Sequence, residues 1–142
     1  MERSTTSPDA YIASLPDSVR EDVAVIDATI AAVMSGEERV LWEGVMWGGT
    51  DQRIIGYGSQ RYVNRSGQEV DWFLIGLARQ KAHLSLYVNA ADDGAYLGQR
   101  YADRLGTVKV GSASITFKRV ADLDLPTLTE MLLRARELSA GT

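Results

Sequence analysis

The sequence predicts an α+β fold: an antiparallel sheet of about five strands, flanked by N- and C-terminal helices, with one further helix inserted late in the chain. Both ends of the 142-residue chain carry apolar residues at helical spacing, whereas residues 40–89 are rich in aromatic and β-branched residues interrupted by glycines. The segments between the predicted strands are short, which favours antiparallel pairing. Helices at the ends and a sheet between them therefore define the fold class.

The first elements are a short helix over residues 8–15 and a longer helix capped by Asp17 or Ser18. Gly36 ends the longer helix, because glycine readily takes the backbone conformation that follows a helix. Apolar residues three and four apart place one stripe of this helix on the core: Val19, Val23, Ile26, Ile30 and Val33.

Strands are predicted near residues 40–46, 53–63, 70–78 and 82–89, with a fifth over residues 113–118. Polar and glycine-containing turns separate the second, third and fourth of these strands, as in consecutive hairpins. The first four strands therefore form a meander, to which the fifth is added after the inserted helix.

The inserted helix is predicted over residues 97–105 and ends at Gly106. Asp124 caps the last helix, and Pro126 is tolerated in its first turn because the amide there needs no partner. Its apolar face is built by Leu125, Leu128, Met131, Leu132, Ala135 and Leu138.

The register of the third and fourth strands predicts which side chains share a face. If the turn at residues 79–81 pairs Ala78 with Ala82, one face carries the alternating set that includes Gly76 and Leu84, and helices cover it. The opposite face then carries Phe73, Ile75, Leu77, His83, Ser85 and Tyr87. Apolar surface of this kind is rarely left open to water, so the helix over residues 97–105, a ligand or a second copy of the chain should cover it.

Length and composition exclude several classes of protein. Residues 1–8 are polar and are expected to form a flexible lead before a single domain over residues 9–139, which places the protein in the cytoplasm. No apolar run is long enough to cross a membrane. The chain contains no Cys and one His, so thiolate metal sites and His clusters are excluded. Its basic residues form no block, which argues against nucleic-acid binding.

Several ordered motifs resemble the YdhG-like family of bacterial domains of unknown function. They are MWG at residues 46–48, IGYG at 55–58, DWFLIG at 71–76, KAHLSLY at 81–87 and FKRVADLDL at 117–125. Family members often read GKSC before the last strand, whereas this chain has GSAS at residues 111–114. The resemblance implies a sheet flanked by helices. Because one member is a frataxin-like intracellular iron chaperone, it also implies a non-enzymatic binding protein with iron as its cargo.

Iron binding of the frataxin type, as the resemblance implies it, uses carboxylates on an early acidic helix and at the edge of the first strand. The candidate metal ligands are Asp17, Glu21 and Glu43. The other acids of the helix, Asp22 and Asp27, flank its apolar stripe on opposite sides and do not converge. A solvated helix face is the alternative interpretation, and folding should require no metal or other cofactor.

The second hypothesis is a small-molecule binding module that uses the aromatic sheet face around His83. Its candidate ligand-binding residues are Trp47, Tyr57, Tyr62, Trp72, His83, Ser85 and Tyr87. His83 is the only side chain with an ordinary pKa near neutrality, but no acid that could orient a Ser85–His83 pair is recognisable, so no catalytic residue is predicted. A partly open cleft near Trp47, Tyr57 or Tyr62, or a homodimer contact on this face, are both left open.

Overall fold

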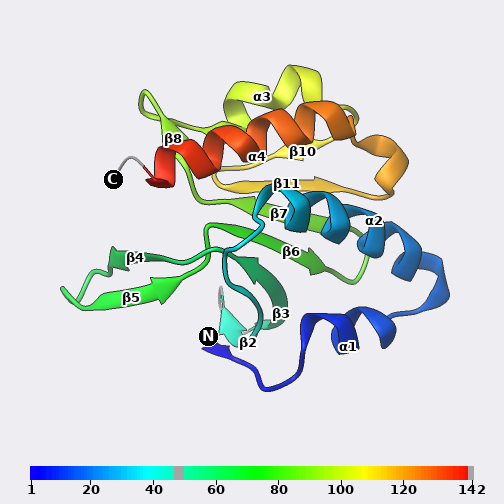
Figure 1. Cartoon of the computed structure of the whole chain (residues 1–142), viewed down its shortest axis with the longest axis horizontal. Helices are drawn as coiled ribbons and strands as arrows, with labels where there is room; N and C mark the ends of the chain where they lie inside the picture. Colours follow the sequence, from blue (N-terminus) through cyan, green and yellow to red (C-terminus); the bar gives the residue numbers. More distant parts are fainter. Residues whose placement is uncertain (47–49, 141–142) are drawn as a thin grey trace.

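A computed structural model describes residues 1–46 and 50–140, and it confirms the α+β fold class. One layer is an antiparallel sheet and the other is formed by helices (Figure 1). The four helices are α1 (Pro8–Ala13), α2 (Asp17–Val33), α3 (Leu97–Leu105) and α4 (Leu125–Ala140), and a 3-10 turn spans Val120–Asp122.

The main sheet has seven strands rather than about five, in the order β1-β2-β3-β6-β7-β11-β10. Four other strands pair in two separate ribbons, β4 with β5 and β8 with β9. The strands of the sheet are β1 (Glu2–Arg3), β2 (Arg39–Met46), β3 (Thr50–Tyr57), β6 (Ile75–Arg79), β7 (Leu84–Val88), β10 (Lys109–Val110) and β11 (Ser114–Phe117). Those of the ribbons are β4 (Gln60–Val63), β5 (Glu69–Trp72), β8 (Ala91–Asp92) and β9 (Ala95–Tyr96).

Helices α2 and α4 take the positions that their apolar stripes predict. In α2 the stripe is buried at Val23, Ile26, Ile30 and Val33. The Asp124 carboxylate accepts a hydrogen bond from the Thr127 amide at 2.9 Å and so caps α4. The main hydrophobic core contains residues of all four helices, so the helices cover the same face of the sheet.

The predicted long strands over residues 53–63 and 70–78 are each divided in two. Gly58 has a φ of +74°, which turns the chain between β3 and β4, and a bend at residues 73–74 separates β5 from β6. The β4–β5 hairpin therefore leaves the main sheet and projects from the body of the molecule (Figure 1).

The predicted register of the third and fourth strands is wrong by three residues. The connection between them is longer than three residues, so β7 begins at Leu84 and Ala78 pairs with Ser85 rather than with Ala82. A shift by an odd number moves a strand's side chains to the other face. Ile75 and Leu77 consequently lie in the helix-covered core, and Gly76 lies beside Tyr87.

Helix α3 does not cover the opposite face of the sheet, contrary to the expectation from its amphipathic sequence. Its buried residues Leu97 and Leu105 belong to the same core as α2 and α4. Gly106 ends it with a φ of +114°, where a Cβ would lie 2.1 Å from the Asp122 carbonyl oxygen. Within the described residues, the opposite face is thus left without a covering helix.

Residues 1–8, expected to form a flexible lead, take part in the fold. Glu2 and Arg3 pair with Glu43 and Trp42 of β2, and Pro8 begins α1. The reason is that the outer edge of β2 offers unpaired backbone groups, which a polar segment without helical pattern can satisfy. Separately, the described chain holds no helix that is long and apolar enough to cross a membrane.

Candidate ligand-binding cleft

The face of the sheet that no helix covers carries a second cluster of buried residues: Trp42, Ile54, Phe73, Ala78 and Tyr87. The rings of Trp72 and Phe73 stack with centroids 4.3 Å apart, and the Trp42 ring lies 5.4 Å from that of Trp72. Such ring contacts stabilise the cluster beyond what the burial of apolar area contributes.

Two glycines let the aromatic rings lie directly on the strands. A Cβ at Gly56 would be 2.6 Å from Trp42 Nε1, and a Cβ at Gly76 would be 2.5 Å from Phe73 Cε1. The close approach that glycines in a strand often mark is therefore made here by the chain's own side chains. The Trp42 indole N–H is buried and has no hydrogen-bond partner among the described residues.

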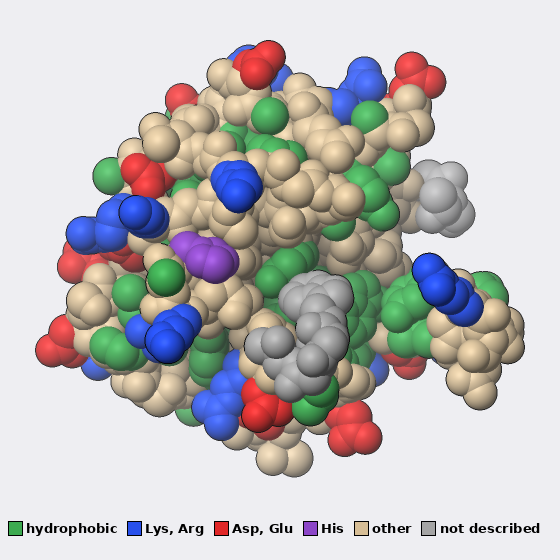
Figure 2. Space-filling model, turned by 180° about the vertical axis from the view of Figure 1, so that it is seen from behind, with side chains coloured by type: hydrophobic (Ala, Val, Ile, Leu, Met, Phe, Trp, Pro, Cys, Tyr) green, Lys and Arg blue, Asp and Glu red, His purple; other side chains and the backbone are tan. Residues whose placement is uncertain are grey.

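Beside this cluster lies a cleft of about 950 Å³. Seen from behind, the projecting hairpin forms a lobe at the right, and hydrophobic side chains line the hollow between it and the body (Figure 2). The hairpin contributes one face to the cleft and the sheet contributes the floor. The lining residues are Met1, Val45, Gln60, Tyr62, Val70, Trp72, Phe73, Tyr87, Asn89, Tyr96, Ser112, Ala113 and Ser114.

Polar side chains at the floor of the cleft already form hydrogen bonds within the protein. The Asn89 side-chain amide donates to the Phe73 carbonyl at 3.0 Å, and the Gln80 amide donates to the Tyr87 hydroxyl at 3.3 Å. Burial raises the pKa of Tyr87, against the hydrogen bonds with Ser85 and Gln80, so this phenol is neutral at physiological pH. At the floor of the cleft a ligand would thus meet aromatic rings, whereas Gln60, Ser112 and Ser114 supply polar groups elsewhere in its lining.

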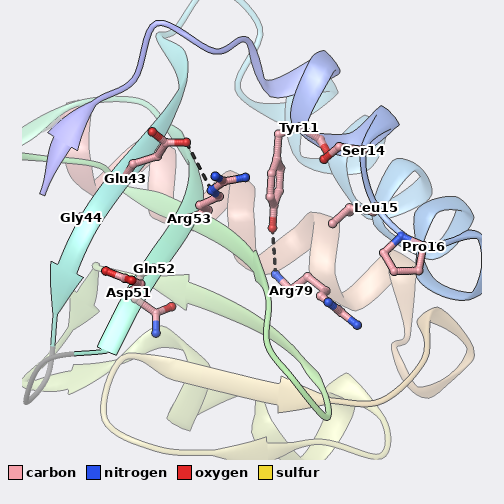
Figure 3. Close-up of a pocket in the computed structure, with 10 residues that line it drawn as sticks. All are labelled: Tyr11, Ser14, Leu15, Pro16, Glu43, Gly44, Asp51, Gln52, Arg53 and Arg79. Carbon is pink, nitrogen blue, oxygen red and sulfur yellow. Dashed lines mark hydrogen bonds and ion pairs between the residues drawn. The ribbon is translucent and has the colours of Figure 1, made fainter.

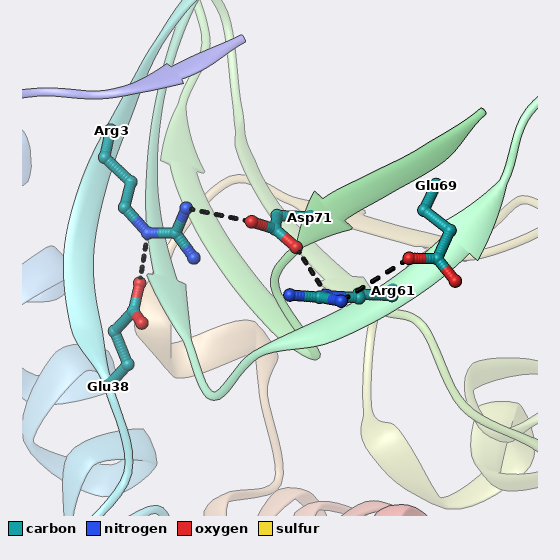
Figure 4. A network of polar contacts seen from close by, with 5 residues as sticks. All are labelled: Arg3, Glu38, Arg61, Glu69 and Asp71. Atoms are coloured by element: carbon teal, nitrogen blue, oxygen red, sulfur yellow. Dashed lines mark hydrogen bonds and ion pairs between the residues drawn. The ribbon is translucent and has the colours of Figure 1, made fainter.

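An exposed ion-pair network supports the back of the hairpin (Figure 4). Arg61 contacts Asp71 at 3.0 Å and Glu69 at 3.4 Å, and Asp71 is 3.8 Å from Arg3. Arg3 also contacts Glu38 at 2.6 Å and lies over the Trp42 ring at 4.5 Å from its centroid. Each exposed pair stabilises little, but together they link the hairpin to the edge of the sheet.

The structure brings three of the predicted ligand-binding residues together. Tyr62, Trp72 and Tyr87 line the cleft, and Ser85 is buried on the same face of the sheet. His83 is exposed in the β6–β7 connection and is not among the residues that line the cleft. Trp47 lies outside the described residues.

Tyr57 lies on the helix-covered face and not in the cleft. Its hydroxyl donates to Asp27 at 2.6 Å, and Arg39 contacts the same carboxylate at 2.8 Å. Burial, with the Asp27 charge and the hydrogen bond to it, raises the pKa of Tyr57 well above its ordinary value, against the opposing effect of Arg39. Tyr57 thus stabilises the packing of β3 against α2, a long-range contact that the local sequence does not indicate.

The predicted metal ligands are not grouped in the described structure. Asp17 pairs with Arg20 at the start of α2, Glu21 is exposed on the same helix, and Glu43 on β2 lies 3.4 Å from Arg53. In residues 1–46 and 50–140, no three His, Cys, Asp or Glu side chains are placed to hold a metal ion together.

Several lining residues were not predicted as part of the site. Phe73 is predicted on the face opposite the helix-covered one, but Phe73, Tyr96 and residues 112–114 are not among the predicted ligand-binding residues. Tyr96 and residues 112–114 reach the cleft through β9 and through the pairing of β11 with β7. The local feature of the sequence that could have indicated residues 112–114 is the small, polar GSAS segment at residues 111–114.

Comparison with family models, with curated proteins and with solved structures gives no match to this chain. The resemblance to the YdhG-like family therefore stays a prediction from the motifs.

Proposed function

We propose that this protein is a binding module for a flat, uncharged and largely apolar small molecule, which the cleft on the exposed sheet face holds. The observation that carries the proposal is that aromatic side chains line a cleft of about 950 Å³ instead of being covered by a helix. Clefts of this size that hydrophobic and aromatic side chains line together with a few polar groups are typical of small-molecule sites.

The lining residues favour a neutral ligand. Apart from the α-ammonium group of Met1, no described residue that lines the cleft carries a formal charge, so most of the cleft offers a bound ion no partner in place of its hydration. Tyr62 of the hairpin, Trp72 and Tyr96 offer ring surface for stacking. Gln60 and the Ser112 and Ser114 side chains supply hydrogen-bonding groups at the border of the cleft.

Binding is favoured over catalysis by the same set of residues. The described part of the cleft contains no carboxylate, His, Cys or Lys that could transfer a proton near neutral pH. The phenol of Tyr87 stays protonated because burial raises its pKa. The side chains therefore support recognition of a molecule rather than its conversion.

A neutral fluorescent probe tests the proposal. N-phenyl-1-naphthylamine should bind saturably, with an increase in its fluorescence, and naphthalene should displace it. Tyr62→Ser should weaken binding roughly three- to tenfold, because one aromatic contact is lost. Val63→Ser is the matched control, since Val63 is the next residue of β4, is 66% exposed and does not line the cleft.

The proposal is wrong if the probe does not bind saturably, or if the two variants weaken binding equally. Native mass spectrometry of the purified protein is an independent test, because it shows whether a molecule is carried from the cell. A retained small molecule that Tyr62→Ser loses and Val63→Ser keeps would identify the ligand directly.

The iron-chaperone function that the family resemblance implies stays a prediction. The described structure adds no observation that favours it, because Asp17, Glu21 and Glu43 do not join a group of three metal-binding side chains. We therefore place the small-molecule hypothesis first.

A further inference from the structure

The β4–β5 hairpin has two unlike faces. Four of its eight paired residues share one face and line the aromatic cleft: Gln60, Tyr62, Val70 and Trp72. The other four alternate with them and so lie on the opposite face: Arg61, Val63, Glu69 and Asp71. The hairpin therefore turns a mainly apolar face toward the cleft and a face with three charged side chains away from it.

The face toward the cleft is only partly buried. Tyr62 is 47% exposed, and Tyr96, which lines the same cleft from β9, is 39% exposed. The hollow of about 950 Å³ separates the hairpin from the body of the molecule (Figure 2). Contiguous apolar surface left exposed in this way is typical of a binding site. Movement of the hairpin into the hollow would cover this surface.

The connections of the hairpin allow it to move as a unit. At one connection Gly58 has a φ of +74°, and its amide donates to the Glu38 carbonyl at 2.7 Å. At the other, the Leu74 amide donates to the Tyr57 carbonyl at 3.2 Å. Beyond these two bonds β4 and β5 pair with each other and not with the main sheet. Rotation of the hairpin about its base therefore breaks no ladder of the main sheet.

A tether restrains the hairpin on its charged face. Among the described residues, a single ion pair joins this face to the rest of the chain: Arg3 with Asp71 at 3.8 Å (Figure 4). The pairs of Arg61 with Asp71 and with Glu69 are internal to the hairpin. Arg3 is itself held by Glu38 at 2.6 Å. Because Asp71 is on the face away from the cleft, movement of the hairpin toward the cleft lengthens its contact with Arg3.

We propose that the hairpin is a flap that closes over a ligand in the aromatic cleft, and that the Arg3–Asp71 pair holds it open in the free protein. The inference rests on the proposed small-molecule function. The stacked rings of Trp72 and Phe73 hold the base of the flap, and its tip closes on the ligand. Contact of the ligand with Tyr62 favours the closed position, and an exposed ion pair opposes it only weakly.

A second pocket of the described structure does not involve the hairpin. It has a volume of about 560 Å³ and lies between α1 and strands β2, β3 and β6 (Figure 3). None of its lining residues belongs to the hairpin or to the cleft. A probe bound in that pocket would leave the hairpin in place, so a change in the position of the hairpin reports on the cleft.

Two spin labels measure the position of the flap, because the chain contains no Cys that would compete for labelling. Arg65→Cys labels the exposed turn of the hairpin, and Lys109→Cys labels exposed β10, which directly precedes the cleft residues 112–114. Saturating N-phenyl-1-naphthylamine should shorten the distance between these labels by several ångströms in double electron–electron resonance. The control pair, Ala28→Cys on α2 with Lys109→Cys, should keep its distance.

Variants of the tether test its role. Asp71→Asn should shift the hairpin toward the closed distance without probe and should tighten probe binding by at most about fivefold. Glu69→Gln is the matched control, since Glu69 lies on the same face and its ion pair is with Arg61 of the same hairpin, and it should change neither value. Salt screens the tether, so it should tighten binding more in the unchanged protein than in Asp71→Asn.

The outcomes separate the flap from the cleft. The flap is overturned if the probe binds saturably while the distance between residues 65 and 109 stays the same, or if the control pair changes equally. It is overturned as well if Asp71→Asn and Glu69→Gln behave alike. A probe that does not bind saturably would instead overturn the proposed function, and the flap with it.

Discussion

Asp22 of α2 and Arg119, which precedes the 3-10 turn, are joined by a hydrogen bond of 2.9 Å from Arg119 Nε to Asp22 Oδ2. The Val120 amide donates to the same oxygen at 3.1 Å. Burial alone would raise the pKa of Asp22, but the hydrogen bonds from Arg119 and Val120 and the Arg119 charge outweigh it and lower that pKa. The contact links residues 97 positions apart and ties α2 to the segment before α4.

Stability should therefore fall in acid. A carboxylate whose pKa is lower in the folded state stabilises the fold above its unfolded pKa, and this contribution is lost as the pH falls through the folded pKa. We expect the free energy of unfolding, measured by urea denaturation, to drop below about pH 4. Asp22→Asn should lower the free energy of unfolding by about 1 kcal/mol at pH 7, a modest value because water screens the exposed Arg119. The variant should also lose less stability in acid than the unchanged protein does. An equal loss of stability in acid for the variant would contradict this role of Asp22.

Tyr57→Phe should destabilise the protein by about 2 kcal/mol, because the Asp27 carboxylate loses a buried hydrogen-bond donor. Because the pKa of Tyr57 is raised in the folded state, its contribution to stability also depends on pH. This contribution is fully present below the pKa of an unfolded tyrosine and declines as the pH rises above about 10. Denaturation curves between about pH 8 and pH 11 check this. The decline should be smaller in Tyr57→Phe, and an equal decline would show that other tyrosines cause it.

Gly76→Ala should destabilise the fold by about 1–3 kcal/mol through overpacking, because a Cβ there would meet Phe73 Cε1 at 2.5 Å and Ile54 Cγ2 at 2.9 Å. Phe73→Leu combined with Gly76→Ala should recover part of the loss, since the shorter side chain leaves room. A double-mutant cycle on thermal unfolding measures this coupling. Strictly additive effects would mean that Phe73 is not the obstacle.

Removal of metal should leave the fold intact. We expect the melting temperature to be the same with and without a chelator, because a full apolar core is present and folding needs no closed ligand set. Iron, added to the chelator-treated protein, should bind more weakly than micromolar and lose affinity with salt, since Asp17, Glu21 and Glu43 offer only dispersed charge. A tight one-to-one site in calorimetry would contradict this and favour the iron chaperone.

Local patterns in the sequence predict the helices well and the arrangement of strands less well. The apolar stripe of α2 and the cap of α4 depend on residues within a few positions of each other, so the local sequence predicts both. The pairing of Ala78 with Ser85 depends on the length of one loop, and a misjudged loop inverts a whole face. The division of two predicted strands at Gly58 and at residues 73–74 likewise reflects the tertiary position of the hairpin.

The cleft was predictable only in part for the same reason. Tyr62 and Tyr87 are predicted on the aromatic face and do line the cleft, because alternation within strands is a local property. Trp72, a predicted ligand contact, also lines the cleft, although the predicted register placed it on the helix-covered face. Tyr96 and Ser112 come from segments that only long-range pairing brings to the sheet. His83, predicted on the fourth strand, lies in the loop before β7 instead.

The seven-stranded sheet ends on both sides in strands of two residues, β1 and β10. Short outer strands that carry charged side chains, here Glu2, Arg3 and Lys109, leave few backbone groups in a row for another chain to add to. Growth of the sheet from one molecule into the next, the first step toward fibrils, is therefore hindered at both margins. Deleting residues 1–3 would uncover the long β2 strand, and aggregation of that truncated chain, absent in the whole one, would show that three residues protect the margin.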